Sequence, residues 1–435
     1  MKKKNFIKKI WNIIYENPRK FLKENLPYFY NPIKCKCDFL IIDNFEPSDL
    51  LTGFRVKEFN HYLNSTENFK LLTFSPFIFT KNWKNNIKNK NIDWATPMSN
   101  SSYKRKLKIY LNKFNISADK FLFMQNRPYE AKGAYLMFLY NTYLAKNFLE
   151  KNKIPFVFTL FPGGGLRLNH EFSDYMLKEV FSSPMFKGCF VPQKIIYDYI
   201  IAKGFTTEDK LFFSYGGGFF QFTKNDVLPK KWYKKDKETF DISFVAYRYM
   251  KKGLDKGFDT VIYTLKELVK KYPFIHLHCV GTNTLDDFDD DFSDIQNNLH
   301  IYPSQKADFF PEFFANIDMA LAPCRANVLA KGAFDGFPLT CEAGYFGVPI
   351  FCSDELQMNY NYKNGEELII IKPNVNDVIE KIDYYINHLE ELRAIGNLGQ
   401  AQIQNFFAFE HQVNQRNKFL NKFLDTAMRY NNETK

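Results

Sequence analysis

The sequence has no uninterrupted apolar run of the roughly 18–20 residues that a bilayer-spanning helix needs, so we expect no transmembrane helix. Its start lacks the apolar core and the small-residue cleavage site of a secretory signal, which favours a cytoplasmic protein. The seven cysteines form an odd set without a C-x-x-C pair, and Cys35 and Cys37 are too close in sequence for an ordinary zinc site. We therefore expect reduced thiols, with Cys279, Cys341 and Cys352 in the core.

Acidic residues are outnumbered, because 48 Asp and Glu face 59 Lys and Arg, which gives a formal net charge of +11. Lys, Asn, Ile and Phe are all abundant, as in an AT-rich coding sequence, so part of this charge is expected to be compositional drift on a solvated surface. The rest suits an anionic substrate or an anionic membrane surface. No nucleic-acid-reading motif accompanies the charge, which argues against a nucleic-acid partner. With 435 residues, 45% of them hydrophobic, the chain can form two or three domains with separate cores.

Residues 1–36 are predicted to form a separate basic segment. Eight Lys and Arg lie within residues 1–30, and apolar residues recur there at helical spacing up to Pro18. These apolar residues are Phe6, Ile7, Ile10, Trp11, Ile13 and Ile14. A basic amphipathic helix with a Trp is typical of an interfacial membrane anchor, and the pattern equally fits a helix packed on the body of the protein.

From residue 37 onward, short apolar runs alternate with helical segments, a rhythm that predicts a doubly wound parallel sheet. The predicted strands are 39–42, 71–74, 121–124, 156–160, 189–191 and 211–214. The predicted helices are 54–64, 131–150, 171–182 and 193–203. Residues 81–118 interrupt the rhythm and are predicted to be a polar, basic, loop-rich insertion.

The rhythm restarts after residues 224–240, which are weakly apolar and indicate a linker. The predicted strands are 242–245, 276–280, 319–321 and 349–351, and the predicted helices are 257–272, 307–316, 339–346 and 375–392. We therefore predict an α/β protein with two Rossmann-like domains, residues 37–235 and 240–405, that face each other across a cleft. A last helix is predicted at about 405–430, and the C-terminal segment, residues 406–435, is expected to pack back on the first domain.

Residues that suit a nucleotide follow the strands of the second domain, where parallel sheets bind ligands. Arg248 follows strand 242–245, and Lys256 lies at the start of the next helix. A guanidinium and an ammonium near a helix N-terminus both favour a diphosphate. Glu342 lies one turn inside a predicted helix within an apolar run, and its carboxylate suits the two hydroxyls of a ribose.

Two further segments were considered as ligand sites. Gly163, Gly164, Gly165 and Arg167 follow strand 156–160, and three glycines there allow a sugar or a phosphate on the acceptor side to approach the backbone. The alternative is a simple tight turn. The acidic stretch 286–291 lacks the spacing and the glycine of a calcium loop, so we interpret it as a solvated loop and expect no metal site.

Taken in order, these segments resemble the donor half of the family 4 retaining glycosyltransferases of the GT-B fold. The resemblance covers about residues 240–405 and includes Arg248, Lys256-Gly257, Asp335-Gly336-Phe337-Pro338, Glu342-Ala343 and Gly347-Val348-Pro349. It implies that Arg248 and Lys256 hold the donor diphosphate and neutralise the leaving group, and that Glu342 binds the ribose. It places Asp335, as a third catalytic residue, with Gly336, Phe337 and Pro338 at the donor sugar. Family members have two acidic residues eight positions apart, whereas Asp335 is seven positions before Glu342.

The resemblance implies a metal-independent, cofactor-free hexosyltransferase with a nucleotide-sugar donor. The acceptor would be a growing bacterial surface polysaccharide, such as capsule or lipopolysaccharide, or a lipid-linked glycan at the inner face of the cytoplasmic membrane. Two alternatives remain: a GT-B-shaped nucleotide-sugar 2-epimerase, and a transferase-like accessory protein without activity. Many family members have a histidine near the loop of residues 161–167, where the nearest is His170, so no catalytic histidine is assigned. His276 and His278 alternate within a strand and are interpreted as structural.

Overall fold

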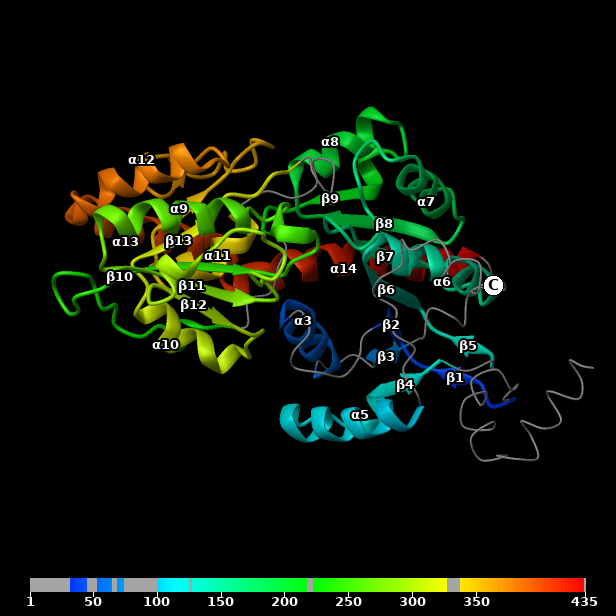
Figure 1. The fold of residues 1–435 in the computed structure, drawn as a ribbon. Helices are drawn as coiled ribbons and strands as arrows, with labels where there is room; N and C mark the ends of the chain where they lie inside the picture. The colour runs from blue at the N-terminus through cyan, green and yellow to red at the C-terminus, as the bar shows by residue number, and fades with distance from the viewer. Residues whose placement is uncertain are drawn as a thin grey trace, which may run out of the picture. The chain divides into compact units, whose positions relative to one another are not determined.

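The computed structural model describes residues 32–44, 53–64, 69–73, 100–124, 127–216, 222–326 and 337–433 (Figure 1). The helix predicted within residues 1–36 lies outside these ranges, as do Asp335 and Gly336. The described helices are α3 (Gly53–Leu63), α5 (Asn100–Phe114), α6 (Leu139–Lys151), α7 (Glu171–Phe181), α8 (Lys194–Ala202), α9 (Phe258–Lys271), α10 (Phe310–Ala315), α11 (Phe337–Tyr345), α12 (Val375–Ile386), α13 (Leu389–Phe407) and α14 (Phe409–Glu433). None of them is long and apolar enough to cross a bilayer.

Two parallel sheets organise these helices. The strands of the first sheet are β2 (Phe39–Asp43), β3 (Phe69–Thr73), β4 (Phe121–Phe123), β6 (Gly133–Met137), β7 (Phe156–Thr159), β8 (Phe186–Val191) and β9 (Leu211–Phe213), and β1 (Cys35–Lys36) pairs separately with β5 (Tyr129–Glu130). The strands of the second sheet are β10 (Phe240–Ala246), β11 (Ile275–Gly281), β12 (Leu299–Tyr302), β13 (Met319–Ala322), β14 (Ile350–Cys352) and β15 (Ile369–Ile370). Grouped by compactness, the chain divides into a first unit, residues 1–159, 176–189 and 420–435, and a second unit, residues 160–175 and 190–419.

The strand orders are those of two doubly wound sheets. The first sheet runs β4-β3-β2-β6-β7-β8-β9, and the second runs β12-β11-β10-β13-β14-β15. In each sheet the first strand of the rhythm lies in the middle, and the chain then winds outward to one side and afterwards to the other, as in a Rossmann fold. The predicted α/β class and the two Rossmann-like sheets are therefore confirmed.

Both faces of the second sheet are covered by helices. Helices α9 and α12 lie on one side of this sheet and α10 lies on the other (Figure 1). One core cluster joins Phe244, Val261 and Ile382, from β10, α9 and α12. A second cluster joins Ala320, Phe314 and Phe346, and so includes β13, α10 and the end of α11. Cys279, Cys341 and Cys352 are buried within these clusters and form no disulfide among the described residues, as predicted.

The predicted helix 131–150 is wrong at its start. Residues Gly133–Met137 form strand β6, which is buried between β2 and β7, and helix α6 begins only at Leu139. Phe138 separates the two elements with a φ of +70°, a conformation that no helix continues through. The run from Gly133 to Leu144 is almost continuously apolar, so its periodicity does not distinguish a buried strand from a buried helix.

Two other predicted helices have different bounds. Residues 375–392 form the end-to-end helices α12 and α13, which are separated at Asn387 and His388. The helix predicted at 405–430 corresponds to the end of α13 and to α14, with a break at Ala408, whose ψ of 137° is extended. Within the predicted loop-rich insertion, residues Asn100–Phe114 form helix α5. Its Lys, Arg and Leu residues are good helix formers, but the polar composition of the segment favoured the prediction of a loop.

The segment predicted to be a linker is anchored on the second sheet. Trp232 and Tyr233 are buried, and the Tyr233 amide donates a hydrogen bond of 2.9 Å to Asp318 Oδ1. Lys230 Nζ donates to the carbonyl oxygens of Phe314 and Ile317, at the end of α10. Burial lowers the pKa of the Lys230 ammonium to about 7. These contacts fix the polypeptide that leads into β10.

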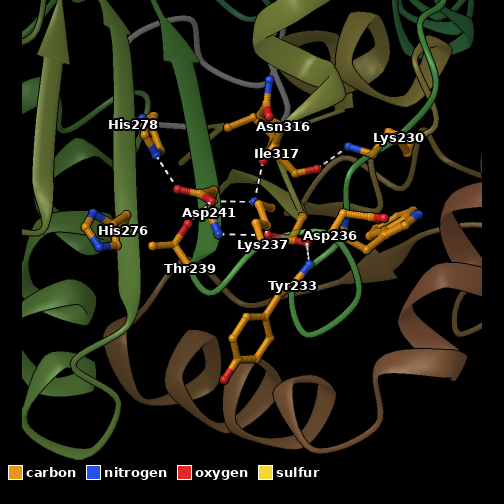
Figure 2. A network of polar contacts seen from close by, with 12 residues as sticks. Lys230, Tyr233, Asp236, Lys237, Thr239, Asp241, His276, His278, Asn316 and Ile317 are labelled. Carbon is orange, nitrogen blue, oxygen red and sulfur yellow. Dashed lines mark hydrogen bonds and ion pairs between the residues drawn. The ribbon is translucent and has the colours of Figure 1, made fainter.

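A buried network of charges holds the amino end of β10 (Figure 2). Lys237 Nζ forms ion pairs with Asp241 of β10 and, at 2.6 Å, with Asp318, which directly precedes β13. The Asp241 amide also donates to Asp318 Oδ2 at 2.9 Å, and His278 Nε2 lies 2.7 Å from Asp241 Oδ1. Burial raises the pKa of the Asp241 carboxyl, but hydrogen bonds from His278 and Lys237 more than offset this, so that the pKa lies below its ordinary value. The network joins β10, β11 and β13.

Arg416 of α14 is fully buried among aromatic rings. Its guanidinium carbon lies 3.5 Å from the ring centroid of Phe190 and 5.9 Å from that of Phe161. One turn further along, the Phe419 ring packs at 5.7 Å on both Phe190 and Phe212. Desolvated cation–π contacts of this kind contribute about 2 kcal/mol, so α14 is bound through specific contacts to β8 and β9.

The buried network predicts a large loss of stability when its cation is removed. In Lys237→Met, the carboxylates of Asp241 and Asp318 lose their shared counter-ion, and unfolding should require about 3–5 kcal/mol less free energy. Urea unfolding followed by circular dichroism measures this change. Lys235→Met is the matched control, because Lys235 is an exposed lysine in the same segment. Equal stability of the two variants would contradict the assignment.

Candidate functional site

The candidate site lies at the carboxyl edge of the second sheet. Strands β10 and β11 end there in register at Ala246 and Gly281. A Cβ atom on Gly281 would lie only 2.1 Å from the Ala246 carbonyl oxygen, and the φ of Gly281 is +136°, so this position requires glycine. Asn283 Nδ2 donates to the same Ala246 oxygen at 2.9 Å. The loops after the two strands therefore begin from a fixed point.

Arg248 lies two residues beyond β10. Its amide donates to Thr282 Oγ1 at 2.8 Å, which ties the β10 loop to the β11 loop. Its guanidinium Nη1 forms an ion pair with Asp287, and 29% of the Arg248 side chain is exposed. The structure thus places a partly exposed guanidinium at the predicted position, with one edge already in contact with a carboxylate.

Lys256 lies at the end of the same loop and is only 3% exposed. Its Nζ lies 5.6 Å from the ring centroid of Tyr249. Gly257 follows as the N-cap of α9 with a φ of +78°, and a Cβ there would lie 2.2 Å from the carbonyl oxygen of Pro323. The backbone of this loop therefore packs directly on the loop after β13, so Arg248 and Lys256 share one well-defined segment.

The neighbouring Asp255 organises this loop from within. Burial raises the pKa of its carboxyl, and its Oδ1 accepts a hydrogen bond of 3.2 Å from the Met250 amide. Arg325, in the loop after β13, also contacts this region. Its guanidinium donates to both carboxylate oxygens of Asp259, at 2.8 and 3.0 Å. Sequence reasoning missed Arg325, although its position just after β13 was a usable signal.

Glu342 lies on α11 between the buried residues Cys341 and Ala343. Burial raises the pKa of its carboxyl to about 7. Among the residues that the structure describes, no hydrogen bond or ion pair of this carboxylate is found. A largely buried carboxylate for which the described residues supply no partner is a candidate ligand group, because burial without a partner is costly.

The other predicted donor residues are placed only in part. Phe337 and Pro338 are the first two residues of α11, so the predicted helix start is correct to within two residues. Asp335 and Gly336 lie outside the described residues, and their predicted roles stay predictions.

The glycine loop after β7 is a tight turn. The Leu166 amide donates to the Gly163 carbonyl at 2.9 Å, and Gly164 and Gly165 have φ values of +54° and +96°. Positive φ values at both central positions are typical of a type I′ turn, and this geometry by itself accounts for the two glycines. The Arg167 amide donates to Ser173 Oγ at 2.9 Å, at the start of α7. The turn follows a strand of the first sheet, whereas Arg248 and Lys256 follow a strand of the second. Its role in binding an acceptor or a phosphate stays a prediction.

The acidic stretch 286–291 and the histidines of the second sheet form no metal site among the described residues. Among the described residues, no group of three or more His, Cys, Asp or Glu side chains is arranged to hold a metal ion. The acidic stretch makes protein contacts instead: Asp290 accepts from Tyr263, and Asp291 accepts from Ser293. His276 and His278 contact His300 and Asp241 at the opposite end of the sheet from Arg248.

Comparison with known proteins relates the second half of the chain to a known family and the whole chain to a known fold. Residues 261–417 match a protein family described as glycosyl transferase-like. No curated protein sequence matches the chain. Among solved structures, the chain resembles HepE of Anabaena in complex with UDP and glucose, with a TM-score of 0.58, 13% identity, and coverage of 89% of this chain and 100% of HepE.

Two further structures have the same fold. Sucrose-phosphate synthase from Thermosynechococcus elongatus has a TM-score of 0.57 at 11% identity and covers 90% of this chain and 100% of its own. A glycosyltransferase from Rickettsia africae has a TM-score of 0.50 at 12% identity. The match covers 92% of this chain and 99% of the Rickettsia protein. The predicted resemblance to the GT-B glycosyltransferases is confirmed. The chain has the GT-B fold, and its residues 261–417 form a glycosyl transferase-like segment.

The raised pKa of Glu342 predicts that this residue destabilises the folded protein at alkaline pH. The folded state retains the proton up to about pH 7, whereas the unfolded carboxyl loses it near its ordinary pKa of 4.5. The free energy of unfolding therefore falls as the pH rises between these values. Glu342→Gln cannot ionise, so its melting temperature should exceed that of the unaltered protein at pH 8 and differ less at pH 5.

Differential scanning fluorimetry without ligand at the two pH values measures this difference. Glu366→Gln is a suitable control, since Glu366 is an exposed carboxylate. A Glu342→Gln variant whose melting temperature shows the same pH dependence as that of the unaltered protein would disprove the desolvation argument.

Proposed function

We propose that this chain is a retaining glycosyltransferase of the family 4 type. It would move a hexosyl group from a nucleotide-sugar donor to a growing bacterial surface polysaccharide or a lipid-linked glycan. The observation that supports this most directly is the pairing of Arg248 and Lys256 on one loop at the carboxyl edge of β10. The loop directly precedes the segment, residues 261–417, that matches the glycosyl transferase-like family. Glu342, on α11 of that segment, adds a carboxylate without a hydrogen-bond or ion-pair partner among the described residues.

The chemistry of glycosyl transfer explains why two cations are needed. As the bond from the anomeric carbon to the diphosphate breaks, the sugar becomes oxocarbenium-like and negative charge grows on the departing diphosphate. Arg248 offers a planar fork of N–H donors with one edge in contact with Asp287, and Lys256 offers a buried ammonium. Both groups stabilise the leaving group more in the transition state than in the bound donor, which is what accelerates the reaction.

Glu342 would bind the ribose of the donor. An ionised carboxylate accepts hydrogen bonds from two adjacent hydroxyls, and each such charged hydrogen bond contributes about 1.5–3 kcal/mol. Asp335 and Gly336, with Phe337 and Pro338, would lie at the donor sugar. A UDP-sugar is the first donor to test, because the HepE structure contains UDP and glucose.

The acceptor side of the proposal depends on other segments. The Gly163–Leu166 turn and Arg167 would contact the acceptor after β7. The basic segment of residues 1–36 would bring the protein to an anionic membrane surface, where a lipid-linked acceptor is embedded. The protein would then act in the cytoplasm, at the inner face of the cytoplasmic membrane.

The decisive experiment is a donor panel. Purified protein is incubated with UDP-glucose, UDP-N-acetylglucosamine, UDP-galactose, GDP-mannose and ADP-glucose, with and without EDTA, and nucleotide release is measured together with the sugar product. We expect release of one nucleoside diphosphate and a free or transferred sugar, unaffected by EDTA, because cationic side chains replace a metal ion. Complete loss of release in EDTA, restored by magnesium or manganese, would refute the metal-independent mechanism.

The same panel separates the alternative functions. A 2-epimerase would change the N-acetyl sugar at C2 without net nucleotide accumulation. An inactive accessory protein would bind a nucleotide, or none, without turnover.

Variants of the cationic pair test the mechanism. Arg248→Ala and Lys256→Met should each lower kcat/KM. The expected loss of transition-state stabilisation is about 2–4 kcal/mol. Methionine preserves the volume of the buried Lys256 side chain, so the fold should persist. Lys251→Ala is the matched control, because Lys251 is an exposed lysine in the same loop. If turnover in both variants equals that of the control, the leaving-group assignment is wrong.

A further inference from the structure

The acidic stretch before Ser293 contains one residue that contacts the proposed catalytic machinery. Asp287 Oδ2 forms an ion pair with Arg248 Nη1 and also accepts a hydrogen bond of 3.0 Å from the Lys252 amide. Lys252 lies in the loop between β10 and α9 that contains both proposed catalytic cations. One carboxylate oxygen therefore contacts the Arg248 side chain and the backbone of the same loop.

We propose that Asp287 is a positioning residue that directs Arg248 toward the donor diphosphate. This inference rests on the function proposed above. A guanidinium has N–H donors on more than one edge, and Asp287 contacts Nη1. The remaining donors stay available for phosphate oxygens, and 29% of the Arg248 side chain is exposed. Among the described residues, Arg248 forms no second ion pair.

Asp287 can position Arg248 because its own loop is anchored. The next residue, Phe288, packs its ring at 6.0 Å from Phe258 of α9 and at 5.6 Å from Phe292. The Lys252 ammonium lies 5.2 Å from the centroid of the Phe288 ring. A carboxylate on an anchored loop holds a long flexible side chain in one orientation before the ligand arrives, so less conformational entropy is lost on binding.

Two opposing effects follow from removing the carboxylate. An untethered Arg248 must be ordered by the ligand, which weakens binding. The lost negative charge would strengthen the attraction of a diphosphate. The second effect acts through solvent, since 22% of the Asp287 side chain is exposed, and moderate salt screens it. Binding measured at about 0.3 M sodium chloride therefore reports mainly the loss of orientation.

A double-mutant cycle tests the proposal. Affinities for UDP, GDP and ADP are measured by isothermal titration calorimetry for the unaltered chain, Asp287→Ala, Arg248→Ala and the double variant. Asp287→Ala should weaken binding of the preferred nucleotide about three- to tenfold. In the Arg248→Ala background it should have no further effect, because a residue that acts only through Arg248 has nothing left to position. Asp287→Asn, which keeps an acceptor oxygen, should recover most of the affinity.

Asp290→Ala is the matched control. Asp290 is an exposed residue of the same loop, and its carboxylate accepts a hydrogen bond from Tyr263 without contacting Arg248. It should leave nucleotide affinity unchanged. The proposal is overturned if Asp287→Ala binds like the unaltered chain, weakens binding equally in the Arg248→Ala background, or matches Asp290→Ala. If the unaltered chain binds none of the three nucleotides, the proposed function fails, and the positioning role of Asp287 fails with it. If the unaltered chain binds a nucleotide and Asp287→Ala binds it equally well, only the positioning role fails.

Discussion

The second sheet depends on how strand β10 is held at its two ends. β10 is the strand that pairs with both β11 and β13. At its amino end, Lys237 joins Asp241 to Asp318, so that three segments meet at one buried ammonium. A slip of one residue would turn every side chain of the strand to the opposite face and separate these charges. Arg248 lies only two residues beyond the other end, so the network that fixes the register of β10 also fixes the position of the guanidinium.

The sequence predicted ten of the thirteen described strands of the two sheets and missed β6, β12 and β15. Short runs rich in Val, Ile and Phe, such as β7 and β10, favour buried strands because they are too short for most helices and are bounded by polar residues. β6 was missed because its apolar residues continue into α6, and only the positive φ of Phe138 separates them. The boundary between α12 and α13 was missed for the same reason. Periodicity records which residues are buried, but not where the backbone turns.

The site shows a similar division. Arg248, Lys256 and Glu342 could be selected because they follow strands of the second domain, and the resemblance to a family then implied their roles. The structure adds a property to each that could not be predicted from the sequence. These properties are the ion pair of Arg248, the burial of Lys256 and the raised pKa of Glu342. Asp287 was grouped with a solvated acidic stretch, since its partner Arg248 lies 39 positions earlier and no local pattern links the two.

Burial raises the pKa of the Glu342 carboxyl to about 7, so some of the free molecules retain this proton at neutral pH. Under the proposed ribose contact, only the ionised form accepts both hydroxyls, so binding near pH 7 would release protons to the buffer. The measured heat of binding would then include the ionisation heat of that buffer. Titrations in phosphate and in Tris would give different enthalpies for the same complex, and the difference would report the net number of protons released on binding, to which Glu342 contributes.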